Sequence, residues 1–202
     1  MVHAYHVVFG AYGFWLPNDP RGSWSDFVAA WELRRFGPAT KTLERKMQLC
    51  SQEHAQLNAA KMALNYSPVI FSGLQAQSIG RGFAIAAKQS NITIHACSIL
   101  PEHVHLVIER HSLRVEQLVR LLKGAATKQL KNDGLHPLAE FERDGSIPSP
   151  WAVGKWKVYL DNEEAIENAI IYVWDNPGKE DKPRQTWSFV RPFYGLLSLI
   201  HI

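Results

Sequence analysis

Two histidines separated by one residue have the types and spacing needed for chemistry. His103 and His105 flank Val104 at the start of an apolar, β-branched run. On a β-strand, residues i and i+2 point to the same face, so the two imidazoles would project side by side while Val104 enters the opposite layer. Two parallel imidazoles at this spacing can share one divalent ion. A lone histidine on a strand is more often a hydrogen-bonded, half-buried residue, so the pair has to be weighed with its surroundings.

The second feature is a tyrosine near the end of a predicted helix. Residues 163–175 combine acidic residues at the start, which suit the helix dipole, with an apolar pattern that contains Tyr172. The sequence Asn176-Pro177-Gly178 follows, and proline and glycine predict that the helix ends there. Asn176 comes one turn after Tyr172 and therefore faces the same way. A tyrosine in this position is ordinarily a core residue with its hydroxyl at the rim.

The elements that must position these residues alternate between strand and helix. Residues 92–99 and 103–108 read as adjacent strands separated by Leu-Pro-Glu, because proline removes a ladder donor. A short β-prone run at 4–10 and an extended segment at 151–160 add strands. Apolar residues at helical spacing predict helices over 51–64, 74–88 and 113–131. The order strand, helix, strand, strand, helix follows, with a last helix over 163–175.

Composition sets the broad class. The 202 residues, of which 46% are hydrophobic, suit one domain over 1–202, with about 13–70 as an insertion or lid. A net charge of +3 permits nucleic-acid binding without requiring it. Cys50 and Cys97 lie far apart without a CxxC motif, which favours reduced thiols. Because no apolar run approaches the roughly 18 residues that a membrane helix needs, we expect a cytoplasmic protein with no membrane contact.

An aromatic, proline-rich loop follows the first strand. Trp15, Arg21 and Trp24 could stack on unpaired bases, as side chains of single-strand binders do. An equally good interpretation is that these aromatics pin an irregular loop to the core.

Basic residues lie off the apolar stripe of the helix predicted over 113–131. They are Arg120, Lys123, Lys128 and Lys131. Such a face can be a solvated surface or a phosphate-contacting face. We predict the second role and keep the first as its alternative.

Two stretches resemble the HUH single-tyrosine transposases of the insertion-sequence and REP-associated type. Leu100-Pro101-Glu102-His103-Val104-His105 resembles the histidine-hydrophobic-histidine signature, and the run from Tyr172 to Lys179 resembles the Tyr-x-x-x-Asn-Pro-x-Lys ending. The loop Trp-Leu-Pro-Asn-Asp-Pro-Arg-Gly is similar to that of a subgroup. The resemblance implies an α+β fold, a ferredoxin-like or RRM-like antiparallel sheet backed by helices.

The resemblance also implies a chemistry. Tyr172 would be the nucleophile, and His103 and His105 would hold a Mg²⁺ or Mn²⁺ ion that polarises a phosphate. Two imidazoles leave the coordination shell of an oxygen-preferring ion incomplete, so the Asn176 amide is the candidate third ligand. Glu102 and His95 are weaker candidates.

The leading hypothesis is a metal-dependent transposase that cleaves and rejoins single-stranded or hairpin DNA through a 5′-phosphotyrosine. A homodimer is one arrangement left open. The alternatives are a domesticated, non-catalytic nucleic-acid-binding or regulatory protein on the same fold, and a histidine-type phosphoesterase that uses water.

Overall fold

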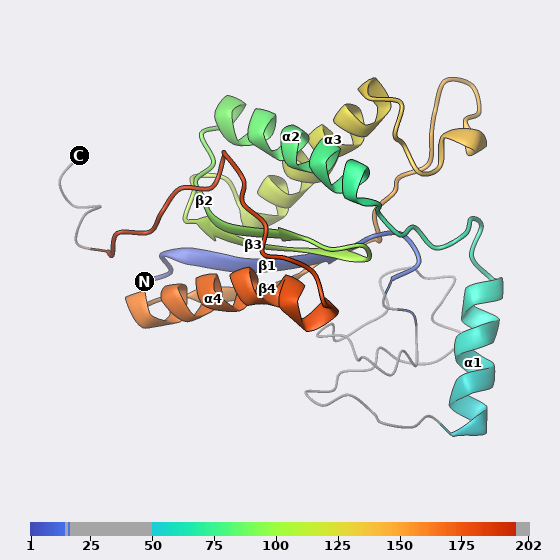
Figure 1. Ribbon diagram of the computed structural model, residues 1–202, viewed down its shortest axis with the longest axis horizontal. Helices are drawn as coiled ribbons and strands as arrows, with labels where there is room; N and C mark the ends of the chain where they lie inside the picture. Colours follow the sequence, from blue (N-terminus) through green and yellow to red (C-terminus); the bar gives the residue numbers. More distant parts are fainter. Residues whose placement is uncertain (15, 17–49, 197–202) are drawn as a thin grey trace.

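A four-stranded antiparallel sheet forms the centre of the molecule (Figure 1). The computed structural model describes residues 1–14, 16 and 50–196. Its strands are β1 (Ala4–Gly10), β2 (Ile94–Ile99), β3 (His103–Glu109) and β4 (Trp156–Leu160), in the order β2-β3-β1-β4. β1 pairs with both β3 and β4, and β2 pairs with β3, all antiparallel. β1 and β3 therefore lie at the centre of the sheet.

Two helices connect the strands on one side of the sheet. α2 (Gly73–Gln89) lies between β1 and β2, and α3 (Val115–Asn132) lies between β3 and β4. This β-α-β-β-α-β order with antiparallel pairing is the ferredoxin-like arrangement, so the predicted fold class is confirmed. The predicted helices over 74–88 and 113–131 agree with α2 and α3 to within two residues. The extended segment predicted over 151–160 is shorter, because β4 begins only at Trp156.

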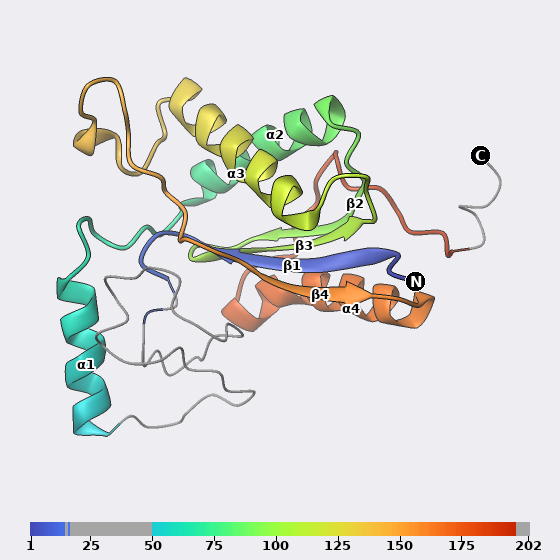
Figure 2. The same cartoon turned by 180° about the vertical axis from the view of Figure 1, so that it is seen from behind.

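The two faces of the sheet carry different helices (Figures 1 and 2). α2 and α3 cover one face, and α4 (Glu163–Asp175) covers the other. Alternating residues of the strands serve the two layers. Phe9, Val104 and Leu106 join the core under α2 and α3, whereas Ala4 and Val107 pack with the helix α4. A side chain that lies an even number of residues from Ala4 on β1, or from Val107 on β3, therefore points toward α4.

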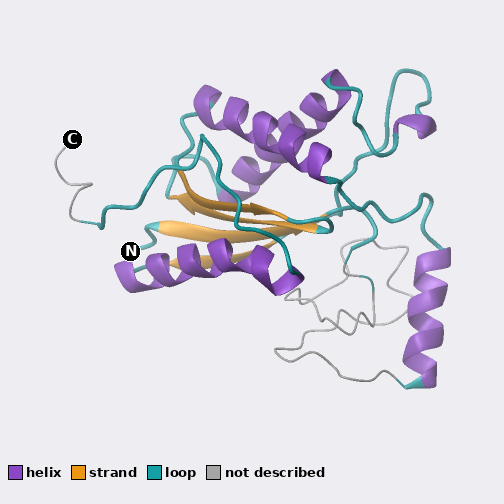
Figure 3. Cartoon of the chain, in the orientation of Figure 1, coloured by secondary structure: helices purple, strands orange, loops and turns teal. Residues whose placement is uncertain are grey.

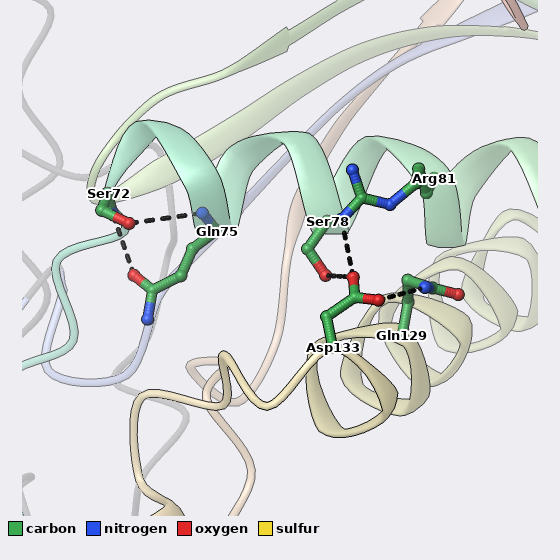
Figure 4. A network of polar contacts seen from close by, with 6 residues as sticks. All are labelled: Ser72, Gln75, Ser78, Arg81, Gln129 and Asp133. Carbon is green, nitrogen blue, oxygen red and sulfur yellow. Dashed lines mark hydrogen bonds and ion pairs between the residues drawn. The ribbon is translucent and has the colours of Figure 1, made fainter.

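Close contact between α2 and α3 fixes the helical layer. A Cβ on Gly82 would lie 2.6 Å from the Ala126 Cα, so only glycine allows this approach. Beside it, the Asp133 carboxylate accepts hydrogen bonds from Ser78 at 2.6 Å, Arg81 at 2.7 Å and Gln129 at 2.9 Å (Figure 4). Ser72 and Gln75 cap the start of α2 in the same view. These contacts stiffen the layer behind β1 and β3.

The C-terminal segment covers the outer edge of β2. The Gln185 side chain accepts a hydrogen bond from the Ile99 N–H and donates one to the Ile99 carbonyl, each at 2.8 Å. Further along, the Arg191 N–H donates to the Ile94 carbonyl at 2.8 Å. Unpaired strand edges invite association with other chains. The segment after α4 therefore closes this edge within the same chain.

One helix stands apart from the sheet. α1 (Ser51–Met62) lies away from the other helices (Figure 3), and its buried Leu57 and Ala60 pack with Leu16. The helix predicted over 51–64 is thus present. The sequence also favours an irregular helical segment over residues 26–36, which lie outside the described residues. Among the described helices, none has the length and apolar character that a bilayer crossing requires.

Candidate active site

The two histidines of β3 project together into the α4 layer. His103 and His105 alternate with Val104, which is fully buried in the opposite core. Their ring centroids lie 4.8 Å apart with the planes at 71°. His105 is 6% exposed, and His103 at the beginning of the strand is half-buried. His103 and His105 therefore lie side by side on one face of β3, as the sequence predicts.

A third histidine joins them from the neighbouring strand. His6 of β1 is registered with Val107, and His105 is registered with Val8, so the two histidines are diagonal neighbours on one face. The His6 Nε2 lies 3.2 Å from the His105 Nδ1. Our sequence analysis missed this residue. The signal was present, because the ferredoxin-like order places β1 beside β3 and a histidine in that strand has a one-in-two chance of facing the pair.

Helix α4 brings the tyrosine to this histidine cluster. The Asn162 side chain accepts a hydrogen bond from the Ala165 N–H at 2.8 Å and caps the start of the helix. Ile166, Ile170 and Val173 then bury one stripe of the helix against the sheet. Tyr172 lies beside that stripe and is 41% exposed.

The Tyr172 ring centroid is 5.7 Å from that of His105 and 5.5 Å from that of His6. Tyr172 and the histidines therefore converge although they are far apart in the sequence. The exposed part of the tyrosine leaves a way in for a substrate from solvent.

Asn176 follows one turn after Tyr172. Its backbone is still helical, with φ −60° and ψ −39°, so its side chain lies on the same side as Tyr172. Asn176 is only 6% exposed, and its Nδ2 atom has no hydrogen-bond partner among the described atoms. Buried amides nearly always have partners. The donor side of this amide is therefore unused among the described residues.

Burial sets the protonation states of the cluster. Burial lowers the pKa of His105 well below the usual value, and the nearby His103, His6 and Lys179 lower it further. Burial also lowers the pKa of His6 to about 4. Both imidazoles are therefore neutral at pH 7 and keep a nitrogen lone pair. Burial raises the pKa of Tyr172, so the resting side chain is a protonated phenol.

Neighbouring side chains hold these groups in position. Phe14 stacks on the His103 ring with centroids 5.0 Å apart and planes 4° from parallel. A Cβ on Gly10 would lie 2.8 Å from the Phe14 ring, so glycine makes room for this stack. On the other side, the Lys179 Nζ lies 3.7 Å from the centre of the Tyr172 ring. A cation thus stands beside the phenol, and sequence reasoning gave this lysine no role.

The residues present fit a hard divalent ion. Among the described residues, no three His, Cys, Asp or Glu side chains are grouped so as to hold a metal. Beside His103 and His105, the buried Asn176 could offer its Oδ1 atom, because hard divalent ions prefer oxygen ligands. His95 is engaged elsewhere, because its Nδ1 lies 3.1 Å from the Arg191 carbonyl oxygen.

Only the basic residues of α3 in the predicted DNA-binding set fall within the part of the chain that the structure describes. Trp15, Arg21 and Trp24 lie outside the described residues. Arg120, Lys128 and Lys131 are exposed on α3, which covers the opposite face of the sheet from α4. Their contact with DNA stays a prediction.

Lys123 contacts the loop before β4. Its Nζ donates hydrogen bonds to the Ala152 carbonyl at 3.0 Å and the Gly154 carbonyl at 2.9 Å, and lies 5.0 Å from the centre of the Phe9 ring. Burial lowers the pKa of Lys123 to about 8. The side chain thus ties down the loop before β4. Contact of Lys123 with DNA stays a prediction, as for the other basic residues of α3.

We expect Lys123→Ala to lower the free energy of unfolding by about 1.5–3 kcal/mol, the usual range for hydrogen bonds to a charged group. Lys128→Ala is the matched control on the same helix, because Lys128 is exposed, and should change that free energy by less than about 0.5 kcal/mol. Urea unfolding followed by circular dichroism measures both. Equal stability of the two variants would show that the loop does not depend on Lys123.

A known protein family matches the part of the chain that carries the two histidines of β3. Residues 62–144 match the family model described as "Transposase IS200 like". No curated protein matches the chain. Two solved structures resemble it distantly. One is a REP-associated tyrosine transposase bound to a REP hairpin, with 12% identity and a TM-score of 0.44 over 88% of this chain and 68% of the other. The second is a candidate transposase from Deinococcus radiodurans R1, with 11% identity and a TM-score of 0.41 over 92% and 94%.

The matched residues run from the end of α1 to the loop after α3 and include β3 with its two histidines. Tyr172 and Asn176 lie beyond them. The similarity to the IS200-like transposase model is therefore confined to residues 62–144, which carry the His-Val-His strand.

Proposed function

We propose that this chain is a tyrosine transposase that nicks and rejoins single-stranded or hairpin DNA through a covalent bond between Tyr172 and a 5′ phosphate. The observation that carries the proposal is the position of the partly exposed Tyr172 phenol beside the neutral, buried imidazoles of His6 and His105. Packing alone does not require three histidines beside a tyrosine. The IS200-like family match of the histidine segment supports the same reaction class.

The reaction exchanges one phosphodiester for another. The Tyr172 oxygen forms a bond to the scissile phosphorus while the bond from phosphorus to the 3′ oxygen breaks. The phenolic proton passes to water, and the leaving 3′ oxygen takes up a proton from solvent. The products are a 5′-phosphotyrosine and a free 3′-hydroxyl. Attack by a 3′-hydroxyl reverses the step and rejoins a strand, so no ATP is consumed.

The chain's own residues supply position and charge for this step. His103, His105 and Asn176 would hold a Mg²⁺ or Mn²⁺ ion, with phosphate and water completing its shell. Such an ion, when bound, polarises the scissile phosphate and offsets the charge that develops on its oxygens. Lys179 adds a cation beside the phenol. Its positive charge favours the approach of a phosphate and stabilises the tyrosine oxygen as it loses its proton.

A nicking assay tests the proposal. Single-stranded and hairpin oligonucleotides labelled at either end are incubated with the protein and Mg²⁺ or Mn²⁺, with and without EDTA, and resolved on denaturing gels. We expect the label on the 5′ side of the cut to appear on a freed strand, and the label on the 3′ side to stay with the protein. EDTA should prevent both.

Other outcomes would replace the proposal. Two freed strands with no protein adduct would indicate a phosphoesterase that uses water. Binding without cleavage of any oligonucleotide under all metal conditions would indicate a domesticated binding protein on the same fold.

A further inference from the structure

The contact between His6 and His105 joins two imidazoles that are both buried. The His6 Nε2 lies 3.2 Å from the His105 Nδ1, with the rings tilted by 27° and the centroids 5.5 Å apart. His6 is 8% exposed and His105 6%. A close pair of ring nitrogens needs one proton between them, because two lone pairs would repel each other. One imidazole therefore donates and its partner accepts.

The direction of this hydrogen bond decides what His105 can bind. A neutral imidazole carries one N–H and one lone pair. If His105 donates through Nδ1, its Nε2 keeps the lone pair and can bind a metal ion. If His105 accepts at Nδ1, its Nε2 carries the proton and can bind no metal. The nitrogen of His6 thus selects between a His105 that binds metal and one that does not.

We propose that His6 is a positioning residue that accepts a hydrogen bond from the His105 Nδ1–H and so keeps the Nε2 lone pair of His105 available for the divalent ion. The inference rests on the proposed function, since it assigns His105 a metal to bind. Histidine ligands commonly donate their second ring N–H to a fixed acceptor, which sets both the tautomer and the ring orientation. In this chain the acceptor is another histidine instead of a carboxylate or a backbone carbonyl.

The surroundings of His6 suit a fixed acceptor. β1 is a central strand, and His6 is registered with Val107 on one side and Val158 on the other. The Trp156 ring meets the His6 ring edge-on with centroids 5.4 Å apart, and Tyr172 meets it at 5.5 Å. Strands on both sides and aromatic rings against its plane leave the imidazole little freedom to turn. Its Nε2 therefore stays directed at His105.

The tautomer of His105 tests the inference in the protein without metal or DNA. Long-range ¹H–¹⁵N correlation spectra at neutral pH distinguish an Nδ1–H imidazole from an Nε2–H imidazole. We expect the wild-type His105 in the Nδ1–H form. His6→Leu fills the space without an acceptor and should shift His105 toward the Nε2–H form. His6→Gln offers an amide oxygen at about the reach of Nε2 and should restore the Nδ1–H form.

A matched control removes a different buried imidazole. His136 lies in the loop after α3, where its Nδ1 accepts a hydrogen bond from the Leu138 N–H. His136→Leu should leave the His105 tautomer unchanged, which separates the His6 contact from general loosening of the fold. A second readout is Mn²⁺ affinity by calorimetry. We expect His6→Leu to weaken it by about 10- to 100-fold, and His6→Gln to restore most of the loss.

The results that would overturn the inference differ from those that would overturn the proposed function. A wild-type His105 in the Nε2–H form, or unchanged Mn²⁺ affinity in a folded His6→Leu, would overturn the role of His6 even if the protein forms a DNA adduct. Absence of the adduct in the wild type would overturn the proposed function while the tautomer spectra still report on the hydrogen bond.

Discussion

Replacing Tyr172 by phenylalanine is expected to abolish both DNA cleavage and the covalent adduct. The change removes one oxygen and leaves the ring to contact His105 and His6 as before. If the phenolic oxygen is the nucleophile, no bond to phosphorus can form, and the cleavage rate should fall by more than about 1,000-fold, equivalent to about 4 kcal/mol of barrier. Denaturing gels of labelled oligonucleotides measure the loss. Thermal stability and Mn²⁺ affinity should stay near those of the wild type.

Tyr159→Phe is the matched control for this experiment. Tyr159 is exposed, and its ring packs on Tyr5 of β1. Tyr5 is adjacent to His6 on the strand, so its side chain points to the opposite face, toward α2 and α3. The control should cleave at the wild-type rate. Cleavage by Tyr172→Phe with an adduct on Tyr159 or Tyr194 would move the nucleophile to that residue. Robust cleavage by Tyr172→Phe with no adduct would favour attack by water.

Replacing His105 by alanine should give the second large effect through a different route. The phenol remains, but the most buried imidazole of the cluster is lost along with the partner of His6. We expect cleavage to fall by about 100- to 1,000-fold, as when one stabilising group is removed from a reacting centre. Mn²⁺ affinity measured by calorimetry should fall as well, unlike in Tyr172→Phe. Excess Mn²⁺ should recover part of the activity.

His136→Ala controls for the loss of a buried imidazole as such. It should keep Mn²⁺ affinity and cleavage, because His136 lies in the loop after α3 and not on the α4 face. If His105→Ala folds and binds Mn²⁺ as tightly as the wild type, the histidines of β3 do not form the metal site. In that case the metal requirement would have to be sought elsewhere in the chain.

Local patterns in the sequence were sufficient to predict the elements of this fold. The strand predicted over 103–108 puts His103 and His105 on one face, and the structure agrees because Val104 between them is fully buried. The acidic residues at its start and the Asn-Pro-Gly stop predict the bounds of the tyrosine helix in the same way. These features depend on residues close in sequence, which is why a single sequence reveals them.

Contacts between distant residues were not accessible in this way. His6 becomes part of the cluster only through the register of β1 against β3, which the sequence does not state. Lys123 looks like a surface cation by helical periodicity, yet the loop before β4 passes over it and takes up its ammonium group. In each case the neighbour that decides the outcome is remote in the sequence.

Tyr172 itself is expected to carry the DNA strand between cleavage and rejoining. The most direct measurement is mass spectrometry of the protein trapped with its oligonucleotide, digested with protease and nuclease. We predict a peptide containing Tyr172 with a 5′-linked nucleotide on the phenolic oxygen, absent when EDTA is included. A wild-type protein that cleaves the oligonucleotide while every tyrosine peptide stays unmodified would contradict the claim.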